Sequence, residues 1–175
     1  MKIYVASSWR NQYQPGVVEA LRASGHEVYD FRNPPGRTGF AWSDIDPDWQ
    51  NWNTEQYIEA LRHPVAIAGF NSDMDALRAC DAVVLVLPSG RSAALEAGWA
   101  CGAGKPVYVY QPEPCEPELM LAMCNRIFRR LETVITQLMI DHLDLDLIDR
   151  LDEAEQALDV PETNDQRPTT NDPAP

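Results

Sequence analysis

Two acidic residues, Glu96 and Asp73, have the surroundings expected of carboxylates that take part in chemistry. Glu96 lies among the small and apolar residues of Ala93–Ala100, where a carboxylate is unusual unless it has a function. Asp73 lies in the run Phe70–Asp75 and is the second candidate, although it could also serve only to start a helix. Carboxyl groups in such places can act as nucleophiles or transfer protons.

The segment Pro88–Ser92 can bind an anion. It leads from an apolar run into the start of a helix, where backbone N–H groups and the helix dipole favour negative charge. A glycine allows close backbone approach, serines offer hydroxyl groups and an arginine supplies charge. The candidate residues are Ser89, Gly90, Arg91 and Ser92. Ser92 could alternatively be only the N-cap of that helix, and the capping-box position is then Leu95 and not Glu96.

Alternating strand and helix patterns must position these residues. Short apolar, β-rich runs predict strands over Lys2–Ala6, His26–Phe31, Ala82–Leu87 and Pro106–Tyr110. Apolar residues at helical spacing predict helices between Pro15 and Gly25 and over Trp52–Leu61, Phe70–Ala79, Ser92–Cys101, Glu118–Ile140 and Leu143–Leu158. A strand, a helix and a second strand within some thirty residues form a βαβ unit with parallel strands. The pattern therefore predicts an α/β fold with an open parallel sheet flanked by helices.

Ligands of such sheets bind beyond the carboxyl ends of the strands. The segments expected there are Ser7–Asn11, the long loop after the second strand, and Pro88–Glu96. A dinucleotide fingerprint is absent after the first strand, and Gly104-Lys105 is followed by proline, which excludes a phosphate-binding loop of the Walker type.

The long loop from Arg32 to Trp52 carries three tryptophans, Trp42, Trp49 and Trp52. Long loops in compact domains are usually functional or disordered, and disordered segments rarely keep so many aromatic residues. These tryptophans could form a small core that packs the loop down, or a wall on which a base stacks. Both interpretations are open, and Trp42 is the candidate ligand contact.

Composition excludes several functions. The formal net charge is −13, and residues 141–175 alone hold 11 acidic against 2 basic residues, so nucleic acid and anionic membranes are not expected partners. The chain has no apolar run of membrane-spanning length, no signal-peptide pattern at its start and no metal-binding cluster among its cysteines and histidines. We expect a cytoplasmic protein with reduced thiols, with a single domain over 1–158 and a disordered tail over 159–175.

The motifs above resemble those of the nucleoside 2-deoxyribosyltransferase family, which includes the 2′-deoxynucleoside 5′-phosphate N-hydrolases. The matching residues are Asp73, Asp81–Val86, Gly90–Ser92, Glu96–Ala100 and Gly104–Val107, together with the first strand and its Ser7–Arg10 loop. The resemblance covers roughly residues 1–110 and implies a flavodoxin-like sheet. It assigns Glu96 as the nucleophile that takes the C1′ atom of the sugar and Asp73 as the residue that assists proton transfer at the base. Members are dimers or larger, so we expect a homodimer or larger oligomer.

The resemblance predicts cleavage or transfer at the N-glycosidic bond of a nucleoside or nucleotide, without a metal or cofactor. Ser7, Ser8 and Arg10, together with Gly90, Arg91 and Ser92, would suit a 5′-phosphate. The loop residues Trp9–Asn11 and the tryptophan-rich insertion depart from the family pattern, which leaves the substrate open. Two other functions are consistent with the sequence: a TIR-like enzyme that hydrolyses NAD, and a nucleotide-sensing module without catalysis.

Overall fold

The computed structural model describes residues 1–158 as a five-stranded parallel sheet with flanking helices. The chain divides into two units, 1–138 and 139–175, and the sheet belongs entirely to the first. The strands are β1 (Lys2–Ala6), β2 (Glu27–Asp30), β3 (Ala82–Val86), β4 (Val107–Tyr110) and β5 (Arg126–Phe128). The helices are α1 (Gln14–Ala23), α2 (Thr54–Ala60), α3 (Pro64–Ala79), α4 (Arg91–Gly102) and α5 (Leu131–Leu158), with short 3₁₀ helices η1 (Trp42–Asp44), η2 (Trp49–Asn51) and η3 (Leu119–Met123).

The strand order is β2-β1-β3-β4-β5, and every neighbouring pair is parallel. This is the flavodoxin-like order, in which the chain changes direction across the sheet between β1 and β3. The predicted α/β class is therefore confirmed. Because ligand crevices form where the order changes, the loops after β1 and β3 are the expected walls of a site.

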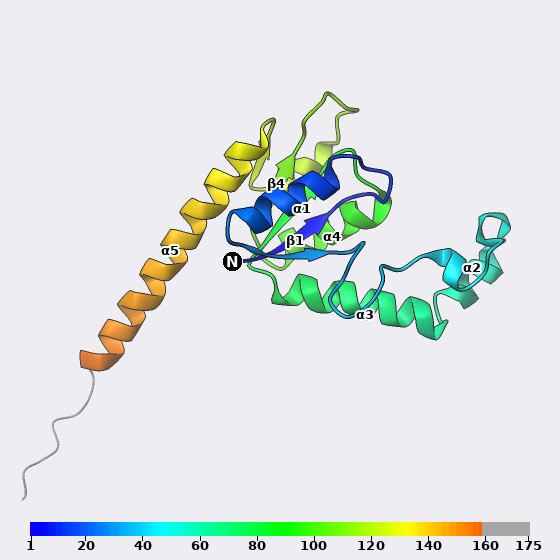
Figure 1. Ribbon diagram of the computed structural model, residues 1–175, viewed down its shortest axis with the longest axis horizontal. Coiled ribbons are helices and arrows are strands. Elements are labelled where there is room, and N and C mark those ends of the chain that lie inside the picture. Colours follow the sequence, from blue (N-terminus) through cyan, green and yellow to red (C-terminus); the bar gives the residue numbers. More distant parts are fainter. Residues whose placement is uncertain (159–175) are drawn as a thin grey trace, which may run out of the picture. The chain divides into compact units, whose positions relative to one another are not determined.

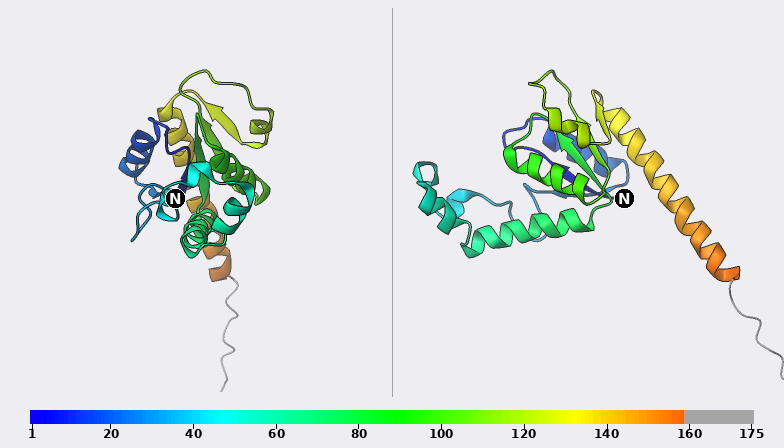
Figure 2. Two further views of the ribbon diagram at one scale, coloured as in Figure 1. Left: turned by 90° about the vertical axis from the view of Figure 1, so that its right-hand side faces the viewer. Right: turned by 180° about the vertical axis from the view of Figure 1, so that it is seen from behind.

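Two hydrophobic cores cover the two faces of the sheet. On one face, α1 and the first turns of α5 pack on alternate strand residues, with Val17 and Leu138 fully buried. On the other face, α3 and α4 pack on the intervening residues, with Leu77 and Ala97 buried. Figure 2 shows α1 and α4 on opposite sides of the strands. The residues of β3 are buried throughout, as expected for the central strand of a doubly covered sheet.

The helix α3 is longer than the sequence pattern predicts. It begins at Pro64, directly after the predicted break at His63, and not at Phe70. Proline is favoured in the first helical turn because its missing N–H would have no partner there. Asp73 therefore lies well inside the helix, and the interpretation of Asp73 as a helix-start residue is wrong.

The region between β4 and α5 also differs from the prediction. The expected helix Glu118–Ile140 is replaced by η3, the edge strand β5 and the start of α5. The side-chain oxygen of Asn125 accepts a hydrogen bond from the backbone N–H of Val107 at 2.8 Å, which joins the approach to β5 to the sheet. The apolar residues at helical spacing in this region belong to three different elements and not to one helix.

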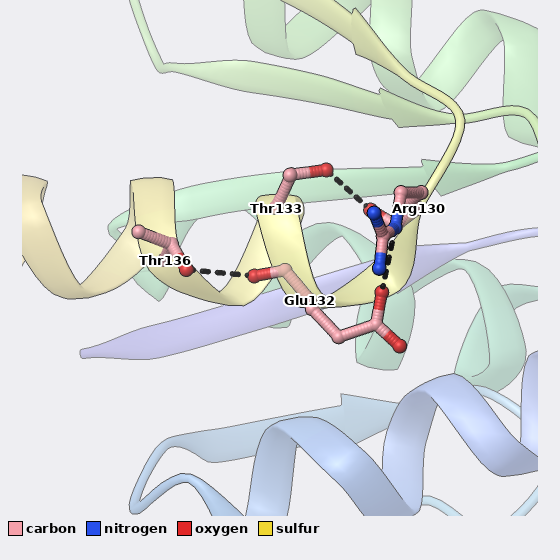
Figure 3. Close-up of polar contacts among 4 residues, drawn as sticks. All are labelled: Arg130, Glu132, Thr133 and Thr136. Carbon is pink, nitrogen blue, oxygen red and sulfur yellow. Dashed lines mark hydrogen bonds and ion pairs between the residues drawn. The ribbon is translucent and has the colours of Figure 1, made fainter.

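The start of α5 is ordered by local polar contacts, which Figure 3 shows. Thr133 Oγ1 donates to the carbonyl of Arg130 at 2.6 Å, and Thr136 Oγ1 donates to the carbonyl of Glu132 at 2.8 Å. Arg130 also forms an exposed ion pair with Glu132 at 3.6 Å. The helix continues without a break to Leu158, whereas separate helices were predicted up to Ile140 and from Leu143.

The predicted tail over 159–175 lies outside the described residues, so its disorder stays a prediction. None of the helices described in Figure 1 combines the length and the apolar content needed to cross a membrane.

Candidate active site

Glu96 and Asp73 line the same cavity of about 400 Å³. Glu96 is the sixth residue of α4 and Asp73 comes from α3, and these two helices cover the same face of the sheet. The cavity also contains residues that follow β1 and β2, so it lies at the sheet edge where the strand order predicts a ligand. The structure thus brings together the two carboxylates that the sequence singled out.

Burial and a second carboxyl control the protonation of Glu96. Burial, followed by the charge of Asp73, raises the pKa of Glu96 from an ordinary 4.5 to about 7. The hydroxyl of Tyr4 acts in the opposite direction because it favours the ionised carboxylate. That hydroxyl is buried and makes no hydrogen bond within the described part of the chain, and Glu96 is the carboxyl group that acts most strongly on its pKa.

Asp73 has a hydroxyl donor of its own. The Tyr29 hydroxyl lies 2.8 Å from Asp73 Oδ1 and 2.9 Å from Ser72 Oγ. Burial raises the pKa of the Asp73 carboxyl, while the Tyr29 hydroxyl and the charge of Arg37 oppose that rise. Because the charge of Asp73 raises the pKa of the Glu96 carboxyl, the two groups titrate as an interacting pair.

Aromatic side chains form a large part of the remaining wall. The cavity is lined by Trp9, Phe31, Phe40, Trp42 and Trp49. Trp9 meets the ring of Phe31 edge to face, with the ring centroids 5.4 Å apart. Trp42 packs in the same way against Trp52 at 5.6 Å while also facing the cavity. The tryptophans of this loop therefore form both a small core and a wall, as both sequence interpretations allow.

Two glycines allow the aromatic loop to lie against the domain. A Cβ atom at Gly39 would come within 2.6 Å of the Phe31 carbonyl oxygen and 2.8 Å of the Trp9 ring. A Cβ atom at Gly69 of α3 would come within 3.0 Å of Phe40. Figure 1 shows the segment after β2 running beside α3 toward α2. Close backbone approach at these positions places the aromatic wall over the carboxylates.

The loop after β1 is held in place by Arg32. Its guanidinium group donates to the backbone carbonyls of Ser8, Trp9 and Asn11 at 2.9, 3.0 and 2.9 Å. The Asn11 side chain in turn donates to the carbonyl of Val86 at 3.1 Å, at the end of β3. The loop that presents Trp9 is thus fixed to both neighbouring strands.

The predicted anion-binding residues are divided between two cavities, except Ser8, which lines neither of them. Ser7, Arg10 and Ser92 line the cavity of the carboxylates, as does Trp42. Ser89, Gly90 and Arg91 line a second cavity of about 280 Å³ next to η3. Ser7 also donates its hydroxyl to the carbonyl of Val86 at 3.0 Å, and Ser8 Oγ accepts from the backbone N–H of Arg10 at 3.2 Å.

The helix α4 differs from the prediction in two respects. Gly90 and not Ser92 occupies the N-cap, and no side chain caps the helix. The small and apolar residues around Glu96 predict a largely buried helix, but only one face is buried, because Ala93, Ala97 and Ala100 pack on the sheet while Leu95 remains 75% exposed. Residues of this amphipathic helix that point sideways, such as Glu96, reach the cavity.

Three residues beside the carboxylates were not identified from the sequence. Tyr4 and Tyr29 are paired in the parallel register of β1 and β2, and their rings stack at 5.2 Å. Aligning the two predicted strands would have placed both tyrosines on one face. Trp9 was noted only as a departure from a family pattern. Within the described part of the chain, no group of three or more metal-ligating side chains is present.

Comparisons with known proteins identify one family. The model of the nucleoside 2-deoxyribosyltransferase family matches residues 3–141. A 2-deoxyribosyltransferase structure from Bacillus psychrosaccharolyticus is 22% identical, covers 77% of this chain and 90% of its own, and has a TM-score of 0.53. A conserved protein from Enterococcus faecalis V583 is 17% identical over 81% and 98% of the two chains, with a TM-score of 0.52.

A third structure, the Clostridium botulinum CMP N-glycosidase BcmB, is 16% identical over 79% of this chain and 98% of its own, with a TM-score of 0.43. No curated protein sequence matches the chain. At these identities the first two structural likenesses show a shared fold.

Proposed function

Because the chain belongs to the nucleoside 2-deoxyribosyltransferase family, we propose that it cleaves or exchanges the N-glycosidic bond of a nucleoside or nucleotide with Glu96 as the nucleophile. Chemistry at that bond is typical of the family. The observation that carries the assignment is the pairing of Glu96 and Asp73 in one aromatic-lined cavity. An aromatic wall suits a planar base, which can stack on it.

The two carboxyl groups divide the work in this proposal. As the C1′–N bond breaks, its electron pair goes to the base, and Asp73 gives its proton to the same base. A Glu96 oxygen stabilises the positive charge that develops on the sugar and then bonds to C1′. Water or a second base then attacks C1′ while Asp73 takes back a proton, which releases Glu96. Water gives hydrolysis, and a second base gives transfer.

One experiment tests the proposed reaction. The protein is incubated with nucleosides, nucleoside 5′-monophosphates and NAD, each with and without a second free base, and the released base is measured by chromatography. We expect release from a nucleoside or a monophosphate. Release of nicotinamide alone would support the NAD hydrolase, and tight binding without any turnover would support a sensing module.

For a substrate with a 5′-phosphate, we propose that Arg10 and the uncapped N-terminus of α4 bind that group. Arg10 lines the cavity of Glu96, and the first turn of α4 has no side-chain cap to occupy its N–H groups. Arg10→Ala should weaken a nucleoside monophosphate by about 1.5–3 kcal/mol, the range for a hydrogen bond to a charged group. Binding of the matching nucleoside should change little, as measured by calorimetry.

Arg91→Ala is the matched control. Arg91 was, together with Arg10, a predicted phosphate ligand, but it lines the neighbouring cavity. We therefore expect a smaller loss of monophosphate affinity from Arg91→Ala than from Arg10→Ala. A larger loss from Arg91→Ala than from Arg10→Ala would indicate that Arg91 binds the phosphate. If Arg10→Ala weakened the nucleoside as much as the monophosphate, Arg10 would not recognise the phosphate.

We also propose that the chain forms a homodimer or larger oligomer through its C-terminal helix. Apolar residues recur along the predicted helix Glu118–Ile140, but part of this stripe is buried inside the first unit, because Val134 and Leu138 belong to the core. The stripe resumes in the second unit, where Leu143 and Leu147 are 66% and 55% exposed. Light scattering at micromolar concentration should give at least twice the chain mass of 19.7 kDa.

Replacing both Leu143 and Leu147 by glutamate should convert this oligomer to a monomer. Leu95→Glu, at an exposed position on α4, is the control and should leave the mass unchanged. A wild-type mass of one chain would contradict the oligomer, and dissociation by Leu95→Glu alone would move the interface to α4.

A further inference from the structure

Two stacked tyrosines, one within β1 and one within β2, lie near the two carboxyl groups. The rings of Tyr4 and Tyr29 are nearly parallel, with an interplanar angle of 15° and a centroid distance of 5.2 Å. The Tyr4 hydroxyl and the Glu96 carboxyl act on each other's pKa, while Tyr29 makes a 2.8 Å hydrogen bond to Asp73. Asp73 therefore has a hydroxyl donor supplied by a strand and not by a loop.

Tyr29 is fixed more firmly than a single hydrogen bond would require. Its backbone lies in the parallel register opposite Tyr4, its ring is stacked, and its hydroxyl also contacts Ser72 Oγ at 2.9 Å. Burial raises the pKa of the Tyr29 hydroxyl well above its ordinary value. The hydroxyl therefore keeps its proton at any working pH and is a fixed donor, not a source of protons.

We propose that Tyr29 is a positioning residue for Asp73, which orients the carboxyl group and stabilises the negative charge that it acquires in the reaction. The inference rests on the proposed function. The hydrogen bond engages Oδ1, which leaves the second oxygen of Asp73 to hold the proton that passes to the leaving base. When that proton leaves, Asp73 becomes a carboxylate, and a hydrogen bond to a charged acceptor is stronger than one to a neutral acid.

The contribution of Tyr29 is consequently greater in the transition state than in the ground state, which is the condition for raising kcat. It should also depend on the substrate, because a base that leaves easily requires little proton transfer. Arg37 also acts on Asp73, because its positive charge favours the ionised carboxylate. The charge of Asp73 in turn raises the pKa values of Glu96 and Tyr4. None of these contacts is removed by deleting the Tyr29 hydroxyl.

The test is Tyr29→Phe, which deletes the hydroxyl and keeps the stacked ring. For a nucleoside whose base is a poor leaving group, kcat should fall roughly 10- to 100-fold, the range for a hydrogen bond to a charged group, while KM stays nearly constant. For a nucleoside with a good leaving base, kcat should change by less than a few-fold. The alkaline limb of the pH profile should move to higher pH, because Asp73 loses a group that lowers its pKa.

Two controls accompany this variant. Tyr57→Phe removes the hydroxyl of a half-exposed tyrosine whose ring packs on Trp42, and it should change neither kcat nor the pH profile. Ser72→Ala leaves the Tyr29–Asp73 hydrogen bond intact and should have a smaller effect than Tyr29→Phe. Melting temperatures of all three variants should stay near that of the wild type.

The outcomes separate this inference from the proposed function. If the wild type releases no base from any substrate, the proposed function itself fails. If the wild type is active and the Tyr29→Phe variant shows the same kcat values and the same pH profile as the wild type, the positioning role is wrong while the proposed function stands. Equal losses on good and poor leaving groups without a shift in pH profile would also overturn the positioning role, because they indicate a structural effect.

Discussion

Glu96→Gln should lower kcat by on the order of 10²-fold or more while leaving substrate affinity within a few-fold. Glutamine has nearly the same shape as glutamate, so the cavity keeps its form and continues to bind. It carries no negative charge to balance the developing positive charge on the sugar, and it forms no stable bond to C1′. Single-turnover and steady-state measurements on a nucleoside with a good leaving base would separate this loss from any effect on proton transfer.

A structural role for Glu96 gives a different result. If the side chain only supported its helix through the dipole, the change would alter stability by about 0.3–1 kcal/mol and leave turnover nearly unchanged. Glu55→Gln, in the first turn of α2, is the matched control for a glutamate with that role. Reaction with a 2-fluoro-substituted nucleoside analogue should give a covalent adduct on Glu96, and an adduct mapped by mass spectrometry to another residue would end the assignment.

The stability of the Glu96→Gln variant provides a second check. Folding raises the pKa of Glu96 from about 4.5 in the unfolded chain to about 7. The protonated group therefore contributes to the free energy of unfolding in full below pH 4.5. This contribution is lost as the pH rises through about 7. Above pH 7 the wild type carries a partly buried ionised carboxylate that the variant lacks. At pH 8 the melting temperature of Glu96→Gln should therefore equal or exceed that of the wild type.

Turnover should respond in opposite directions to pH for two kinds of substrate. Glu96 has a pKa of about 7 and interacts with Asp73, so the two carboxyl groups together lose their last proton as the pH rises through about 7. A poor leaving base needs that proton on Asp73, so kcat should fall about tenfold per pH unit above 7, or on the order of 10²-fold by pH 9. A good leaving base needs only ionised Glu96, so its kcat should rise through pH 7 to a plateau.

Asp73→Asn tests the origin of the falling kcat for the poor leaving base and of the rising kcat for the good one. The variant should lose most activity on the poor leaving base and keep most activity on the good one. The acid limb for the good leaving base should move to lower pH, because the charge of Asp73 no longer raises the pKa of Glu96. Identical pH profiles for both substrates in the wild type would contradict a division of roles between the two carboxyl groups.

Most of the sheet could be predicted because its strands are short, apolar and bounded by polar residues. The bounds of β1 are those predicted, and β3 and β4 differ by one residue at one end. The region after β4 could not be predicted in this way, since Leu119, Met123 and Ile127 happen to continue the helical spacing of α5. The strand β5 has only three residues, too few for an alternating pattern to be seen.

The residues of the candidate site could be predicted where their type is unusual for the surrounding sequence. Glu96 stands out among alanines, whereas Tyr4 and Tyr29 are ordinary residues for a strand and gain their meaning only from the register that joins them. The position of Arg91 could not be predicted because the direction of a side chain at the start of a helix depends on the helix axis. Arg91 lines a neighbouring cavity and not the one that contains Glu96 and Asp73.

The aromatic wall gives the protein an optical property. Of the five tryptophans in the chain, Trp9, Trp42 and Trp49 line the cavity, and Trp52 packs on Trp42. Trp99 alone lies elsewhere, on the outer part of α4. A base that stacks against this wall must alter the emission of most of the indole rings in the molecule. Intrinsic fluorescence therefore reports occupancy of the cavity directly, and Trp99→Phe would remove the background from the one distant ring.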